Sequence, residues 1–165
     1  MTLSIAKSVR HALLPLGVGL LLAAGPLAAA EPDPAAAEIM ALAKAQWSAE
    51  DQSKPAAQAW SSVANDYTEF NPLVSTLVEG KATAARFYDA SLQSGDKGMV
   101  SEMINPHVQV YGDTAILAYN FAGVTKDREG KMNPNLAKST RVYVKQDGKW
   151  MLVHANFAPV VNPSP

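Results

Sequence analysis

The second half of the sequence alternates apolar and polar residues with a period of two, and this pattern limits the possible folds more than any other feature. From Met99 onward, Val108 and Val110 lead to Gly112-Asp113, and the run Ala115-Ile116-Leu117-Ala118-Tyr119 follows. Glycine and aspartate tolerate the positive φ angles that a tight hairpin turn requires. The pattern therefore predicts an antiparallel hairpin around this turn.

A second hairpin is predicted at Asp147-Gly148, which is the strongest turn signal in the chain. Residues 140–145 and 149–157 flank this turn and are predicted to pair as strands. Between the two hairpins, residues 126–135 are polar and contain glycine and proline, as expected of a loop. Residues 159–165 contain three prolines and cannot continue a strand.

Helical spacing replaces this alternation in the first part of the chain. The residues that recur on one helical face are Ile39, Leu42, Ala43, Gln46 and Trp47. They predict a first helix over about residues 35–49. Pro55 opens a short second helix, which we expect to end at Asn65-Asp66. Residues 81–94 are predicted as a third helix, with Gly95 as its C-cap.

Two short strands are predicted between the second and third helices, at residues 67–70 and 73–78. The order is therefore helices, a short strand pair, one more helix and four long strands. This order predicts an α+β fold in which the helices cover one face of a curved antiparallel sheet. We expect such a sheet to enclose a cavity.

The composition fits a packed domain and excludes several classes of function. Hydrophobic residues make up 48% and charged residues 18%, which argues against disorder. Lys and Arg number 14 against 15 Asp and Glu, so the net charge of -1 gives no electrostatic basis for binding nucleic acid. The absence of cysteine excludes disulfides, thiolate nucleophiles and zinc–cysteine sites.

The N-terminal residues 1–30 have the pattern of a secretory signal peptide. Lys7 and Arg10 precede an apolar stretch, and Leu27-Ala28-Ala29-Ala30 supplies the small residues that a signal peptidase recognises. We expect cleavage after Ala30, which would leave residues 31–165 as one periplasmic or secreted domain. A retained membrane anchor is the alternative, but prolines and glycines interrupt a stretch already shorter than the roughly 20 apolar residues that a span needs. No stable membrane insertion is expected after cleavage.

Six motifs carry a resemblance to a known family. They are Leu77-Val-Glu-Gly-Lys, Arg86-Phe-Tyr, Asn105-Pro-His-Val-Gln-Val-Tyr-Gly-Asp-Thr-Ala, Ala118-Tyr, Ser139-Thr-Arg-Val-Tyr and Asp147-Gly-Lys-Trp-Met-Leu-Val-His. Together they resemble the association domain of calcium/calmodulin-dependent protein kinase II, over about residues 47–159. That family belongs to the nuclear transport factor 2-like superfamily, with the SnoaL-like proteins and ketosteroid isomerases.

The resemblance implies a cone-shaped (cystatin-like) curved antiparallel sheet with three helices packed on its concave face. It also implies a non-catalytic domain that associates with itself as a homodimer or a larger ring, without a cofactor. The kinase motifs themselves, a glycine-rich loop after a strand, His-Arg-Asp and Asp-Phe-Gly, are not present in this sequence, so we do not expect kinase activity.

Arg141 is the most informative single residue, because it stands in a strand among apolar neighbours. Its guanidinium must either meet a carboxylate inside the fold or face a wet pocket as an anion receptor. The resemblance matches Arg141 to a pocket arginine, and it implies that Phe121, Phe157 and Ala85 stand where the family has further cations. A pocket lined by Arg141, Tyr119, Tyr67, Phe121 and Phe157 would favour a small amphipathic ligand that bears one carboxylate.

An isomerase, cyclase or hydrolase is the alternative hypothesis, because enzymes of this superfamily use a carboxylate base and a tyrosine donor inside the cone. The candidate bases are Asp66, Glu69 and Glu102, and the candidate donors are Tyr67 and Tyr119. Strand alternation places Tyr67 and Glu69 on one face and Phe70 on the other. The sequence leaves open which face meets the cavity.

The remaining candidates are expected to be structural. His107 and His154 lack the spacing of metal ligands, so no metal site is expected. We expect seven aromatic residues to form core or cavity wall. They are Trp47, Trp60, Phe70, Phe87, Phe121, Tyr143 and Trp150.

Overall fold

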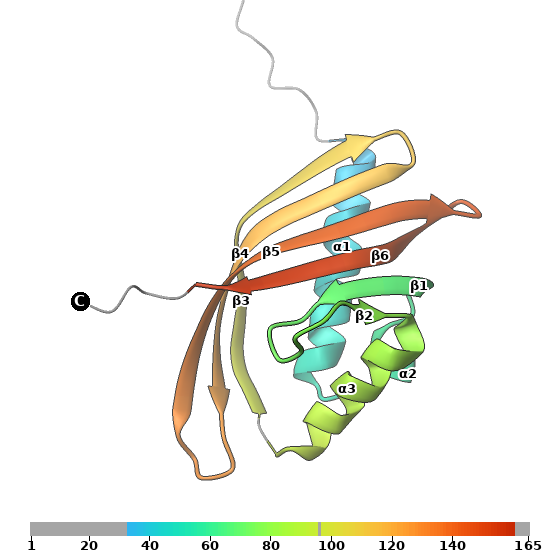
Figure 1. Ribbon diagram of the computed structural model, residues 1–165. Coiled ribbons are helices and arrows are strands. Elements are labelled where there is room, and N and C mark those ends of the chain that lie inside the picture. Colours follow the sequence, from blue (N-terminus) through green and yellow to red (C-terminus); the bar gives the residue numbers. More distant parts are fainter. Residues whose placement is uncertain (1–32, 96, 161–165) are drawn as a thin grey trace, which may run out of the picture. The chain divides into compact units, whose positions relative to one another are not determined.

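The computed structural model describes residues 33–95 and 97–160, which belong to the compact unit Glu31–Pro165 (Figure 1). The expected signal peptide lies outside these residues. The helices are α1 (Pro34–Asp51), α2 (Ala56–Ala59) and α3 (Lys81–Gln93). In α1, the Asp33 carboxylate accepts a hydrogen bond from the N–H of Ala35 at 2.9 Å, and a proline occupies the first turn. The third helix follows Gly80, whose φ of 83° suits glycine.

Six strands form one sheet. They are β1 (Val63–Phe70), β2 (Val78–Glu79), β3 (Lys97–Tyr111), β4 (Thr114–Lys126), β5 (Met132–Gln146) and β6 (Lys149–Pro159). Their order across the sheet is β2-β1-β6-β5-β4-β3. Both predicted hairpin turns are confirmed, since Tyr111 pairs with Thr114 and Gln146 with Lys149.

The sheet is mixed rather than wholly antiparallel, because β1 runs parallel to β6. No hairpin joins these two strands, so no local turn dictates their relative direction. The strand β1 also begins earlier than predicted, and Asn65-Asp66 lies inside it instead of ending a helix. Val63 and Ala64 are buried, and the N–H of Leu152 donates to the carbonyl of Ser62 at 2.7 Å. Pairing with β6 therefore outweighs the helical pattern after Ala59.

The polar loop predicted at residues 126–135 is shorter in the structure, because β4 runs to Lys126 and β5 begins at Met132. Asp127 makes this tight connection possible. Its carboxylate accepts hydrogen bonds from the N–H of Glu129 at 3.1 Å, the N–H of Lys131 at 2.8 Å and the side-chain amide of Asn133 at 3.2 Å. A single side chain thus satisfies the turn, and the strands extend on both sides of it.

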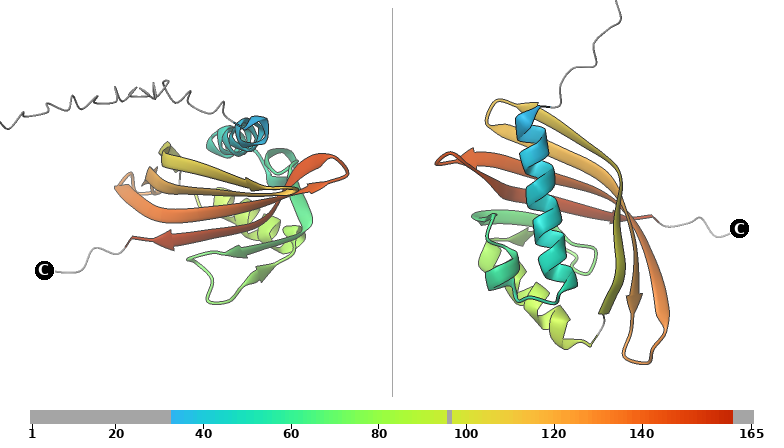
Figure 2. Two further views of the ribbon diagram at one scale, coloured as in Figure 1. Left: turned by 90° about the horizontal axis from the view of Figure 1, so that it is seen from above. Right: turned by 180° about the vertical axis from the view of Figure 1, so that it is seen from behind.

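The long strands curve around the helices (Figure 2). The helix α1 contacts β3 and β4, and α3 contacts β1. Register shifts bend β3 near Asn105 and β6 next to its pairing with Tyr143, as β-bulges do. Side chains that face the helices are buried, among them Leu117, Tyr143 and Leu152. Within the described residues, no helix has the length and apolar character needed to span a membrane.

Candidate functional site

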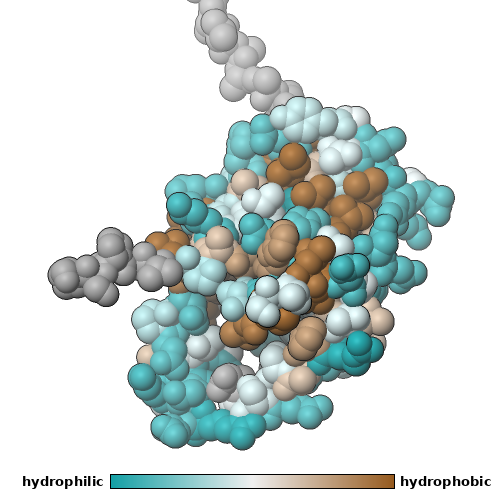
Figure 3. Space-filling view, in the orientation of Figure 1, coloured by the Kyte–Doolittle hydropathy of each residue, from teal (hydrophilic) through white to brown (hydrophobic). Residues whose placement is uncertain are grey.

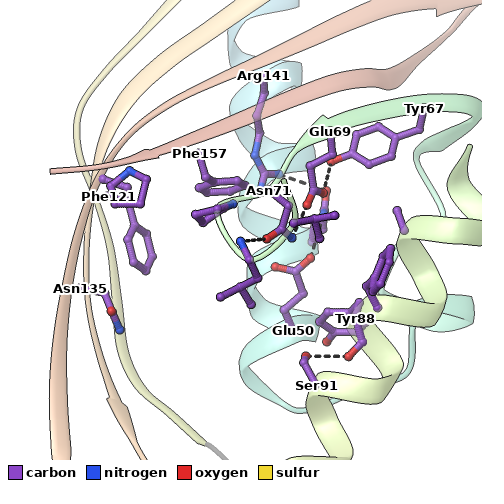
Figure 4. Close-up of a pocket in the computed structure, with 18 of the residues that line it drawn as sticks. Glu50, Tyr67, Glu69, Asn71, Tyr88, Ser91, Phe121, Asn135, Arg141 and Phe157 are labelled. Carbon is purple, nitrogen blue, oxygen red and sulfur yellow. Dashed lines mark hydrogen bonds between the residues drawn. The ribbon is translucent and has the colours of Figure 1, made fainter. Parts of the chain in front are cut away.

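A cavity of about 530 Å³ lies between the inner face of the sheet and the helices α1 and α3 (Figure 4). The polar and charged residues that line it are Gln46, Glu50, Tyr67, Glu69, Asn71, Tyr88, Ser91, Asn135 and Arg141. The apolar lining includes Trp60, Leu73, Val74, Phe87, Phe121, Leu136, Phe157 and Pro159. The volume lies within the range of about 300–1,000 Å³ that is common for small-molecule sites.

Arg141 projects from β5 toward this cavity and is 3% exposed. Its Nε donates to the hydroxyl of Tyr119 at 3.2 Å, and its Nη1 donates to Oε1 of Gln46 at 3.1 Å. The guanidinium carbon also lies 5.8 Å from the ring centroid of Trp47, a cation–π contact. All three partners are neutral, so within residues 33–95 and 97–160 the buried salt bridge that the sequence allowed is not formed.

The guanidinium remains charged in this environment. Burial by itself lowers the pKa of Arg141, but Tyr119, Tyr143 and Glu50 act in the opposite direction and raise the pKa above its usual value. A guanidinium has more N–H donors than Tyr119 and Gln46 use. Arg141 is therefore a charged donor group at the cavity wall.

The sequence did not predict the series of hydrogen-bonded side chains that continues from Arg141 through Gln46 to Glu50. Gln46 lies on the buried face of α1 and donates from Nε2 to Oε1 of Glu50 at 2.8 Å. The indole Nε1 of Trp60 donates to the same carboxylate oxygen at 2.9 Å. The available signal was the glutamine itself, which occupies a helical position otherwise filled by apolar side chains.

Glu69 is a second polar centre of the cavity and is 9% exposed. Its two carboxylate oxygens accept hydrogen bonds from the hydroxyl of Tyr67 at 2.7 Å and from the side-chain amide of Asn71 at 2.6 Å. Burial raises the pKa of Tyr67 well above its usual value, and the neighbouring Glu69 raises it further. The structure thus answers which face of β1 meets the cavity: Tyr67 and Glu69 point inward, whereas Phe70 is 52% exposed.

The other candidate bases lie elsewhere. Asp66 and Glu102 are exposed and do not line the cavity, because each points to the opposite side of its strand from the helices. Of the predicted ligand contacts, Phe121 and Phe157 line the cavity beside Arg141. Tyr119 is 4% exposed and touches the guanidinium without lining the cavity itself.

Most of the predicted aromatic wall is present, with two differences. Trp60, Tyr143 and Trp150 are buried. Phe70 lies on the outer side of the sheet and contacts His154, with 5.8 Å between ring centroids. Phe87 lines the cavity from α3 but remains 49% exposed, so it belongs to the mouth rather than to the core.

Tyr88 packs against Trp60 near the floor of the cavity, with ring centroids 5.2 Å apart. Burial, together with the nearby carboxylates of Glu50, Asp89 and Asp51, raises the pKa of Tyr88 to about 12. Its hydroxyl donates to the carbonyl of Lys54 at 2.9 Å. Tyr88 is therefore a neutral hydrogen-bonding group in the physiological pH range.

A second cavity of about 270 Å³ meets the same guanidinium from the side of β3. It shares Glu50, Phe121, Arg141 and Phe157 with the larger cavity. In the part of the chain that the structure describes, no group of three His, Asp or Glu side chains could hold a metal ion. His107 is exposed on β3, and Nδ1 of His154 lies 2.9 Å from the hydroxyl of Thr68.

Comparisons with known proteins agree with this fold. The family model described as "Calcium/calmodulin dependent protein kinase II association domain" matches residues 35–159. The delta subunit of calcium/calmodulin-dependent protein kinase type II from Oryctolagus cuniculus is 33% identical over 89 residues, which are 53% of this chain and 17% of that protein. The chain thus spans a small part of that relative.

Two solved structures show the same arrangement of strands and helices. The hub homology domain of the Chlamydomonas reinhardtii kinase is 28% identical, with a TM-score of 0.63 over 77% of this chain and 99% of that one. A nuclear transport factor 2-like superfamily protein from Salmonella enterica is 17% identical, with a TM-score of 0.67 over 78% of this chain and 93% of that one. The curved cone fold expected from the motifs is confirmed.

Proposed function

The chain belongs to the calcium/calmodulin-dependent protein kinase II association-domain family, and from this premise we propose that it is an exported, non-catalytic domain that associates with itself and binds a small amphipathic carboxylate. The observation that carries the ligand class is Arg141, a buried guanidinium at the cavity wall whose hydrogen-bond partners are neutral. No kinase activity is proposed for this chain.

Neutral hydrogen-bond donors hold the two carboxylates of the cavity. Glu69 accepts from Tyr67 and Asn71, and Glu50 accepts from Gln46 and Trp60, so donors already surround both charges. The guanidinium has more N–H donors than Tyr119 and Gln46 use, with the Tyr143 hydroxyl as a further neutral neighbour, and the rest of the wall offers the aromatic faces of Phe121 and Phe157 together with Leu136 and Pro159. A carboxylate head on an apolar body satisfies both parts of this surface.

Self-association would use the outer face of the sheet, the side turned away from α1. Its apolar residues include Ile104, Ile116, Val142, Val144 and Met151, of which Ile104 is 40% exposed. Apolar surface gathers over β5 and β6 on the side seen in Figure 3. An exposed apolar patch on a sheet face is typical of an interface between subunits. The similar Chlamydomonas reinhardtii structure is described as a hub homology domain, and this description supports the proposal of self-association.

The proposal is tested by native mass spectrometry of the chain purified from its own host. We expect an oligomer that carries a small bound acid, and we expect Arg141→Leu to assemble normally without that adduct. The matched control is Arg86→Leu, which removes an exposed arginine from α3 and should keep the adduct. An adduct of equal abundance on the Arg141→Leu protein would remove Arg141 from the binding site.

Export rests on residues 1–30, with cleavage between Ala30 and Glu31 and release of the domain into the periplasm or the medium. Edman sequencing of the protein from the envelope and culture fractions should give Glu-Pro-Asp-Pro as the N-terminus. Mature protein that still begins at Met1 would contradict both the cleavage and the proposed location.

A second candidate function is proton transfer on a lipophilic substrate, with Glu69 as the base. The observation that favours it is the position of Glu69 in an apolar-walled cavity, with the Tyr67 hydroxyl 2.7 Å away. Deuterium exchange into the α-carbon of an amphipathic ketone, followed by NMR, tests it. Glu69→Gln should abolish catalysed exchange, whereas Asp66→Asn and Glu102→Gln, outside the cavity, should leave it unchanged. Equal exchange rates in all three variants would end this hypothesis.

A further inference from the structure

The amide of Gln46 joins a cation to an anion inside the fold. Its Oε1 accepts from Nη1 of Arg141 at 3.1 Å, and its Nε2 donates to Oε1 of Glu50 at 2.8 Å. A guanidinium can only donate and an ionised carboxylate can only accept, so these two neighbours fix the orientation of the amide. Gln46 is 7% exposed, which leaves water little access to this link.

We propose that Gln46 is a positioning residue that determines the charge of the ligand. Its neutral oxygen holds the guanidinium of Arg141. The acidic side chain of α1 then lies one turn further along the helix, at Glu50. The positive charge of Arg141 is thereby left for the carboxylate of the ligand. This inference rests on the proposed function and adds to it the device that selects an anionic head group.

The helix geometry explains why the order of these two residues matters. Positions four residues apart lie on one face of a helix, so Gln46 and Glu50 are stacked along the same wall of the cavity. A carboxylate at position 46 would stand within hydrogen-bond distance of Nη1 and would neutralise the guanidinium internally. A carboxylate at position 50 reaches it only through the amide.

Exchanging the two side chains tests this directly. The double variant Gln46→Glu/Glu50→Gln keeps the net charge, and its amide can still accept from Trp60 and donate to position 46. Titration of the residues 31–165 protein with octanoate is the measurement, with octanol as the neutral control ligand. We expect octanoate to bind the exchanged protein at least about tenfold more weakly than the wild type, a difference of about 1.4 kcal/mol.

Glu38→Gln/Ala45→Glu is the matched control, because it moves a carboxylate between two exposed positions of α1 outside the cavity and keeps the net charge. Its octanoate affinity should stay within about twofold of the wild type. Glu50→Gln alone separates the two halves of the exchange, and it should weaken octanoate binding less than the exchange does. If the exchanged protein binds octanoate as the wild type does, the inference is wrong, because the acid next to Arg141 then has no effect on the ligand. If Glu50→Gln loses binding as strongly as the exchanged protein, Glu50 rather than Gln46 is responsible and the inference is also wrong.

Thermal unfolding without any ligand tests independently whether a carboxylate at position 46 would pair with Arg141. A carboxylate at position 46 beside Arg141 would have a lowered pKa in the folded protein, so its stabilisation is present above the unfolded value of about 4.3 and is lost as the pH falls. The exchanged protein should therefore melt at a higher temperature than the wild type at pH 7, with the difference vanishing in acid. A melting temperature that is equal or lower at pH 7 overturns the inference.

The two readouts also separate this inference from the proposed function. A wild type that fails to bind octanoate contradicts the proposed ligand class, while the melting temperatures still decide whether Gln46 leaves Arg141 uncompensated. If the Arg141→Leu protein still binds octanoate, the proposed role of Arg141 in the binding site is contradicted as well. Only the response to the exchange of positions 46 and 50 bears on Gln46.

Discussion

At the scale of single residues, the notable feature is a buried cation held by neutral partners. Arg141 lies on a strand whose neighbouring side chains build the core, and it is fixed by a hydroxyl, an amide and an indole ring. A buried charge without a direct ion pair is costly in an apolar environment, and the carboxylate of Glu50 reaches Arg141 by hydrogen bonds only through the Gln46 amide. The proposed anionic ligand would offset this cost, so its binding should also stabilise the fold.

The linkage gives a prediction for Arg141→Leu in the absence of ligand. Replacing a buried charge that has no direct ion pair by a shorter apolar side chain should change the free energy of unfolding by less than about 1 kcal/mol, or raise it. Urea denaturation of wild type and variant measures the difference. A loss of about 3–5 kcal/mol is the effect of breaking a buried ion pair, and it would contradict the neutral surroundings described for Arg141.

The special role of Arg141 could be predicted from the sequence, because a charged residue interrupts an apolar strand and this signal does not depend on the rest of the fold. Glu69 could be named but not placed, since alternation gives two faces of β1 without saying which one is inside. Glu50 had no signal at all. Its contact with Gln46 is local, since the two residues lie four positions apart on α1, but its contact with Trp60 depends on how the chain beyond α2 packs against α1, and that packing is not a local property of the sequence.

At the scale of elements, the connection between β4 and β5 depends on Asp127. Hydrogen bonds from the backbone N–H of Lys131, and then from Asn133, Glu129 and Gly130, lower the pKa of the Asp127 carboxyl below its usual value. A group with a lowered folded-state pKa stabilises the fold above its unfolded pKa, about 3.9, and this contribution is lost as the pH falls.

Asp127→Ala should therefore lower the melting temperature at pH 7, and the difference from the wild type should shrink below about pH 4. Glu129→Ala, in the same turn, is the matched control, because the Glu129 side chain accepts none of these bonds. Differential scanning calorimetry over this pH range measures both. A pH-independent difference for Asp127→Ala would mean that the charge of its carboxylate does not hold the turn.

The long hairpins could be predicted because their turns are encoded in neighbouring residues, and a strand pair joined by such a turn has one possible direction. The parallel pairing of β1 with β6 had no comparable signal. The two strands are far apart along the chain, and their pairing follows from how the sheet packs with α3, which contacts β1. The same reasoning explains why residues 63–66, with a helical pattern of their own, belong to β1 instead.

At the scale of the whole molecule, the outer face of the sheet is expected to meet a second copy of the chain. Val142 lies at the centre of this face, opposite Ile116 on the neighbouring strand. Val142→Lys should leave the fold intact, because the lysine ammonium can reach water from a half-buried position, but it should reduce self-association by at least about tenfold. Analytical ultracentrifugation measures the sedimenting mass.

Gln58→Lys is the control for this experiment, since it places the same charge on an exposed position of α2. The control should sediment as the wild type does. If Val142→Lys and Gln58→Lys sediment identically as oligomers, the interface lies elsewhere on the molecule and the role of the outer face is wrong.

The central claim is that the guanidinium of Arg141 receives the carboxylate of an amphipathic ligand. The most direct measurement is the ¹⁵N–¹H spectrum of the arginine Nε–Hε groups of the residues 31–165 protein during titration with octanoate, with octanol as the control. The account predicts a saturable shift of one resonance, absent from the spectrum of Arg141→Leu, and no shift of that resonance with octanol. An Arg141 resonance that ignores octanoate, or that moves equally with octanol, would contradict it.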